Sequence, residues 1–95
     1  MVAYIVVRMD VTNADQYETY KAAAPAAIAK YGGTYLARGG AIETVEGDDE
    51  TRRVVILQFP DMDAARAFYN SPEYTAAREK RAGAANGQFV LVEGL

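Results

Sequence analysis

The chain has 95 residues, a net charge of -3 at pH 7 and no cysteine, histidine or tryptophan. This length corresponds to one domain, which we place over residues 1–95. The missing residue types exclude disulfides, cysteine–histidine zinc sites and catalysis by a cysteine nucleophile or a histidine base. The acidic balance argues against a nucleic-acid partner, and no apolar run reaches the length of a membrane span. We therefore expect a cytoplasmic protein without a signal peptide, a metal or a bound cofactor.

The first element is a strand, which alternation of side chains predicts over residues 2–11. The face that begins at Ala3 is wholly apolar, so we expect it to pack on helices. The opposite face carries Tyr4 and Arg8 among valines and is mixed. This mixed face should lie in an environment that is neither fully dry nor fully solvated.

A helix follows, whose buried stripe is predicted from helical spacing to hold Tyr17, Tyr20, Ala24, Ala27, Ile28 and Tyr31. Either Thr12 or Asn13 has the side chain of an N-cap. Pro25 lies inside the pattern and lacks a backbone donor, so we expect a kink or a break into two segments. The pair Gly32-Gly33 supplies the positive φ with which helices often end.

The middle of the chain predicts two strands joined by a polar turn. The first strand covers residues 34–38, and we expect Gly39-Gly40 to form a bulge or bend before the chain continues extended over residues 41–46. A turn at residues 47–50 then leads into a strand at residues 52–59. The apolar run within this last strand indicates that it is covered on both faces.

The last third predicts two short helices and a final strand. Pro60 ends the preceding strand, and Asp61 is a natural cap for the first helix. Ser71-Pro72 ends that helix and begins the next one, with serine as the cap and proline in the first turn. The final strand is expected over residues 88–93.

The order strand, helix, strand, strand, helix, strand is that of the α+β, ferredoxin-like βαββαβ fold. It gives a four-stranded antiparallel sheet with helices on one face. The other face would leave apolar side chains in water, so we expect a second copy of the chain to cover it. The expected partner is therefore the protein itself, as a homodimer.

Several segments resemble the domain-of-unknown-function 1330 family. They are residues 31–40 (YGGTYLARGG), Phe59-Pro60 and residues 64–74 (AARAFYNSPEY), supported by Ala24-Pro25 and residues 81–84. The resemblance covers essentially the whole chain. It implies membership of the dimeric α+β barrel superfamily, in which two ferredoxin-like sheets pair into a barrel. Cofactor-free quinol monooxygenases, ligand-binding proteins and structural proteins all belong there, so the resemblance implies fold and dimerisation more than activity.

The candidate ligand-binding residues are polar side chains on the mixed sheet face, near the glycine bend and beside the second short helix. They are Tyr4, Arg8, Arg38, Glu46, Tyr69 and Tyr74. Arginine binds carboxylates or phenolates in a bidentate manner, and tyrosine can bond a ligand. The structural alternatives are a salt bridge from Arg38 to Glu43 or Glu46, and interface packing for Tyr4. We place Tyr69 and Tyr74 at most on the rim, and we assign no catalytic residue.

Two functions remain open at the level of the sequence. One is an enzyme that uses no cofactor and acts on a small aromatic or carboxylate-bearing metabolite in the barrel cavity. The other is a non-catalytic ligand-binding or structural dimerisation domain, because the residue types that supply most nucleophiles and bases are missing.

Overall fold

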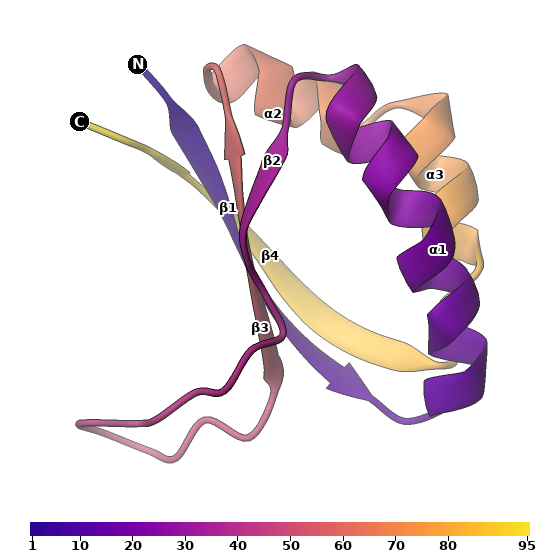
Figure 1. Ribbon diagram of the computed structural model, residues 1–95, viewed down its shortest axis with the longest axis vertical. Coiled ribbons are helices and arrows are strands. Elements are labelled where there is room, and N and C mark those ends of the chain that lie inside the picture. Colours follow the sequence, from indigo (N-terminus) through magenta and orange to yellow (C-terminus); the bar gives the residue numbers. More distant parts are fainter.

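The computed structural model describes residues 1–95 as one antiparallel sheet with three helices on one of its faces (Figure 1). Its strands run in the order β2-β3-β1-β4. This arrangement confirms the α+β, ferredoxin-like fold. No helix is both long and apolar enough to cross a membrane. In chain order the elements are β1 (Ala3–Val11), α1 (Ala14–Lys30), β2 (Thr34–Arg38), β3 (Arg53–Phe59), α2 (Met62–Tyr69), α3 (Pro72–Glu79) and β4 (Ala85–Glu93).

The helices begin at side chains that satisfy free backbone N–H groups. Asn13, rather than Thr12, caps α1, and its Oδ1 accepts a hydrogen bond from the N–H of Gln16 at 3.1 Å. Asp61 caps α2 and Ser71 caps α3, as predicted, each accepting from the N–H three residues further on. These local bonds fix where each helix starts.

Pro25 does not break the first helix, so the expected division into two segments is wrong. Helix α1 is continuous over 17 residues with Pro25 inside it. A proline at this position cannot donate to the carbonyl of Lys21, four residues earlier. That carbonyl instead accepts a hydrogen bond from Nη2 of Arg38 at 2.9 Å. A side chain from a strand therefore replaces the missing helical bond.

The predicted strand over residues 41–46 is not formed. Strand β2 ends at Arg38, and residues 39–52, called the arm below, contain no regular element. The arm leads away from the sheet on the side opposite the helices (Figure 1). Of the two forms expected for the glycine pair, the chain shows a bend at Gly39, and the bulge lies earlier, between Tyr35 and Ala37. Gly39, at φ +68°, ends the strand.

The two faces of the sheet differ in burial. On the helix side Ile5, Leu57 and Phe59 are no more than 2% exposed and belong to one core cluster of 17 buried residues. On the open side Val6 pairs with Ile56 and with Val90, which forms an apolar row across three strands. We call this side the open face. It is the face that carries the mixed side-chain set of the first strand.

Candidate active site between α1 and the sheet

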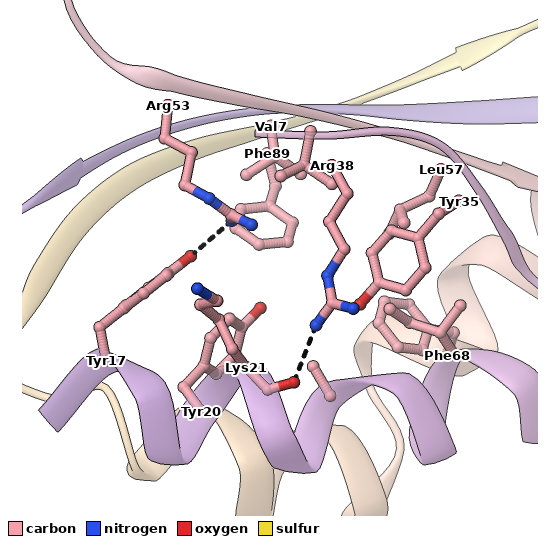
Figure 2. Close-up of a pocket in the computed structure, with 13 residues that line it drawn as sticks. Val7, Tyr17, Tyr20, Lys21, Tyr35, Arg38, Arg53, Leu57, Phe68 and Phe89 are labelled. Atoms are coloured by element: carbon pink, nitrogen blue, oxygen red, sulfur yellow. Dashed lines mark hydrogen bonds between the residues drawn. The ribbon is translucent and has the colours of Figure 1, made fainter. Parts of the chain in front are cut away.

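A pocket lies between α1 and the helix-covered face of the sheet (Figure 2). Its interior holds a cavity of about 20 Å³, which is room for about one water molecule. Aromatic and aliphatic side chains form most of its wall, and two guanidinium groups lie at its mouth. The lining residues are Val7, Tyr17, Tyr20, Lys21, Ala24, Ile28, Tyr35, Arg38, Arg53, Val55, Leu57, Phe68 and Phe89.

Arg53 begins β3 and reaches across to α1. Its Nη1 donates a hydrogen bond to the hydroxyl of Tyr17 at 3.1 Å, and its guanidinium carbon lies 5.6 Å from the centre of that ring. The hydroxyl of Tyr17 thereby has a donor fixed upon it, so its own proton must point elsewhere. The pair places a cation and a phenol side by side at the pocket mouth (Figure 2).

Arg38 lies on the other side of the mouth. Its guanidinium carbon is 4.7 Å from the ring centre of Tyr35, and its Nη2 bonds the carbonyl of Lys21 (Figure 2). These contacts use one edge and one face of the guanidinium. Arginine has five N–H donors, so several remain for a ligand.

The bulge in β2 decides on which face Arg38 lies. Tyr35 is opposite Leu57 and Arg38 is opposite Val55, and both of these partners face the helices. In a strand without a bulge, residues 35 and 38 would point to opposite faces, since side chains alternate. The extra residue, Leu36, therefore brings both side chains into one pocket.

The pocket mouth is electropositive. Neither Arg38 nor Arg53 forms an ion pair, whereas the third cation there, Lys21, is bonded to Glu18 at 2.9 Å. Burial raises the pKa of the Tyr35 phenol, so this side chain stays protonated and able to donate. The polar groups of the pocket are thus cationic or neutral donors, which suits a ligand that carries an oxyanion.

Comparison with known sequences identifies the family. The chain matches the family described as Domain of unknown function (DUF1330) over residues 2–95. It belongs to the DUF1330 family. No functionally curated protein matches it.

Solved structures share the fold of this DUF1330 chain at low sequence identity. A protein of unknown function from Rhodopseudomonas palustris superposes with a TM-score of 0.78 at 18% identity, covering 99% of this chain and 82% of the other. SnoaB, a cofactor-independent oxygenase from Streptomyces nogalater, gives 0.71 at 20% identity, covering 99% and 93%. A dimeric ferredoxin-like protein of unknown function from Thermobifida fusca gives 0.65 at 20%, covering 99% and 92%. At these identities the likeness establishes the fold alone.

The DUF1330 structure separates the residues predicted to share a site. Tyr4 and Arg8 lie on the open face, where Arg8 Nε forms an ion pair with Glu50 Oε1 at 3.2 Å. Glu46 is exposed on the arm and lines a surface groove together with Arg8. Arg38 lies on the helix side, so the open face and the pocket are distinct places, and neither of the salt bridges considered for Arg38 is formed.

The two predicted rim tyrosines also divide. Tyr69 is half-buried beside α3, where its hydroxyl accepts from Nη1 of Arg78 at 2.8 Å. Tyr74 is fully buried, and its hydroxyl lies 2.8 Å from that of Tyr20. Burial holds the pKa of Tyr20 far above its ordinary value. Tyr74 is therefore a core residue that contacts the pocket wall from behind.

Sequence reasoning missed Arg53 and the polar role of Tyr17. Helical spacing predicts for Tyr17 only a place in the buried stripe of α1, and its side chain is indeed only 3% exposed. The available signal was period-two alternation in β3, because Arg53 shares a face with Val55 and Leu57. A charged residue at the start of a buried face points to a polar partner across the layer.

Proposed function

We propose that this DUF1330 protein binds a small aromatic anion in the pocket between α1 and the sheet. The observation that supports the proposal is a pair of arginines without ion pairs, Arg38 and Arg53, at the mouth of an apolar, tyrosine-rich pocket. The aromatic wall suits a planar ring, and the guanidinium groups suit a carboxylate or phenolate on that ring. This combination of an apolar wall and a few convergent polar groups is typical of ligand sites.

Entry of such a ligand requires the mouth to open, since the cavity holds about 20 Å³. Arg38 is exposed on β2, an edge strand, and no ion pair holds it. An oxyanion that replaces the carbonyl of Lys21 as its partner would draw this side chain aside. Arg53, bonded to Tyr17, would remain as the fixed part of the site.

As an enzyme, the protein would use the anionic form of the ligand itself as the reactive group. The pocket wall contains no carboxylate, and Glu18 at its outer edge is bonded to Lys21. The two guanidinium groups would instead lower the pKa of a bound phenol, as nearby positive charge favours the ionised form. A phenolate is the electron-rich form that reacts with molecular oxygen, and SnoaB, of the same fold, is a cofactor-independent oxygenase. Such a reaction would need no bound cofactor.

Binding is tested by calorimetric titration with benzoate and with its neutral analogue benzamide. Benzoate should bind and benzamide should not. Loss of a charge-assisted bond of about 1.5–3 kcal/mol predicts a Kd for Arg53→Met that is raised about 10- to 100-fold. Arg66→Met is the matched control, because Arg66 is exposed and pairs only with Asp63. An unchanged Kd for Arg53→Met would remove the pocket from consideration.

Turnover is tested separately by oxygen uptake with 1,4-dihydroxynaphthalene as the probe. Uptake that is lost in Arg53→Met supports the catalytic form. If benzoate binds and no oxygen is consumed with this probe, the non-catalytic binding protein is the function that the result favours. The two measurements therefore distinguish the enzyme from the binding module.

We also propose that the functional unit is a homodimer joined through the open face. Val90 and Val92 on this face are 40% and 47% exposed, and Leu36 is 54% exposed. Solved relatives of this fold are described as dimeric. Ile56→Lys would place a charge in the centre of the apolar row, so sedimentation should show a monomer. Ala26→Lys on the exposed side of α1 is the control, and a monomeric wild-type protein at micromolar concentration would contradict the assignment.

A further inference from the structure

The arginines of this chain divide according to whether they form ion pairs. Of seven arginines, Arg8, Arg52 and Arg66 are in ion pairs. The other four form none, although the chain has 13 acidic residues. Two of them line the pocket described above. The remaining two, Arg78 and Arg81, lie together in a different groove.

This second groove lies between α3 and β4, at the opposite edge of the sheet from β2. Its volume is about 480 Å³, within the range of small-molecule sites of roughly 300–1,000 Å³. No acidic side chain lines it, and half of its wall is apolar. The lining residues are Tyr69, Arg78, Arg81, Ala85, Asn86, Gly87, Phe89 and Leu91.

Aromatic rings hold both guanidinium groups in place. The guanidinium carbon of Arg78 is 5.0 Å from the ring centre of Tyr69, whose hydroxyl it also bonds. That of Arg81 is 5.5 Å from the ring centre of Phe89 and 5.2 Å from that of Tyr20. A stacked guanidinium keeps its N–H edge free for a planar, bidentate partner.

Arg81 also has an unmet hydrogen-bonding requirement. Its Nε is buried and has no partner, which is uncommon because buried donors are nearly always bonded. On either side of Arg81 in the chain, the carbonyls of Lys80 and Ala82 accept hydrogen bonds from Nε2 of Gln16, at 3.2 and 2.8 Å. Arg81 is therefore a cation without an ion pair, held beside a groove and with one of its donors unsatisfied within the protein.

We propose that the groove between α3 and β4 is a second ligand site, which binds a small carboxylate with an apolar body. The carboxylate meets the N–H edges of Arg78 and Arg81. The apolar body lies against Phe89, Leu91 and Ala85 in the wall. The planar fork of arginine matches the two oxygens of a carboxylate, and its aromatic supports leave little conformational entropy to lose.

The two ligand sites are independent in their charged residues. They share only Phe89 in their walls, and Arg38 and Arg53 do not line the groove. Binding in the groove should therefore persist in the Arg53→Met variant. Failure of binding in the groove would therefore not contradict the function proposed for the pocket, and failure of binding in the pocket would not contradict the second site.

The test is an NMR titration of ¹⁵N-labelled full-length protein with phenylacetate, followed at the backbone amides of Asn86 and Gly87 and at the Nε–H of Arg81. These signals should shift with a single Kd, and Arg81→Gln should raise that Kd at least about 10-fold. Arg81→Lys, which keeps the charge without the fork, should recover part of the affinity. Arg66→Gln is the matched control. Arg78→Gln provides the same comparison if Arg81→Gln does not fold.

Three results would overturn the site. The first is the absence of shifts at Asn86 and Gly87 with phenylacetate up to about 10 mM, because a Kd above that concentration is too weak for a metabolite site. The second is equal binding of the neutral phenylacetamide. The third is a groove whose signals change with protein concentration while those of the open face do not, because a second copy of the chain would then be the occupant. A competition experiment with inorganic phosphate tests whether the groove is selective for carboxylates. If only carboxylates displace phenylacetate, the result supports the proposal. If phosphate displaces it equally well, the groove is a general anion contact and the proposal is overturned.

Discussion

Replacing Pro25 and Arg38, singly and together, tests whether the side chain of Arg38 compensates for the proline. Pro25 cannot donate to the carbonyl of Lys21, and Nη2 of Arg38 bonds that carbonyl at 2.9 Å. In Pro25→Ala the alanine N–H regains the helical bond. Arg38 then loses its backbone partner, so the two residues should be energetically coupled.

The magnitudes follow from the exposure of the bond. Arg38 is exposed, so water replaces part of the lost bond, and Arg38→Met should lower the free energy of unfolding by about 0.5–1.5 kcal/mol. Pro25→Ala should stabilise the helix by about 1–3 kcal/mol, reduced by the greater freedom of the unfolded chain. In the Pro25→Ala background Arg38→Met should cost less than half of its cost in the wild type.

The measurement is urea unfolding of the four proteins at one fixed protein concentration, since the stability of the proposed dimer would depend on concentration. The double-mutant cycle should give a coupling free energy of about 0.5–1 kcal/mol. Arg66→Met in both backgrounds is the control and should show no coupling. Equal costs for Arg38→Met with and without the proline would refute the compensation.

Three further predictions concern the core and the arm. Gly33→Ala should destabilise the fold by about 1–3 kcal/mol in thermal unfolding, because the new Cβ would lie 2.6 Å from the buried ring of Phe59. Gly40→Ala, which has open space around it, is the control and should be near neutral. Equal effects of the two substitutions would contradict this prediction. Tyr20→Phe and Tyr74→Phe should each cost about 1–3 kcal/mol by leaving one buried hydroxyl unpaired, and the double variant should cost less than their sum in urea unfolding. Hydrogen bonds from Arg52 lower the pKa of Glu50 to about 2. The bonds between Glu50 and the arginine should therefore persist above pH 4.5 and be lost as the pH falls through about 2. A carboxyl NMR titration of Glu50 with a midpoint near 4.5 would contradict this.

Local chemistry made the fold predictable from the sequence. The caps at Asp61 and Ser71 and the proline that follows Ser71 act within one helical turn, so their meaning does not depend on distant residues. The alternation of the first strand likewise separated a buried face from an open one. Element order then allowed few topologies, and the ferredoxin-like arrangement was the one observed.

The parts that were mispredicted depend on contacts across the fold. The sequence predicts that residues 41–46 continue the extended chain after the glycine pair, but no neighbouring strand pairs with them. The sequence predicts a kink or a break at Pro25, but the helix is continuous, and the replacement donor comes from a strand 13 residues further along the chain. A single sequence does not show which distant side chain will fill a missing bond.

The position of Arg38 depends on two such irregularities acting together. The bulge at Leu36 turns Arg38 towards the helices, and Pro25 leaves the carbonyl of Lys21 free to receive it. Without the bulge, Arg38 would point to the open face, and without Pro25 it would lose the carbonyl of Lys21 as a hydrogen-bond partner. Both irregularities lower the stability of their own element, and both contribute to one cation at the mouth of one apolar pocket. Two local departures from ideal geometry that converge on a single side chain point to a role for that side chain in binding rather than in packing. This is why we propose the ligand site at Arg38 and Arg53 rather than on the open face.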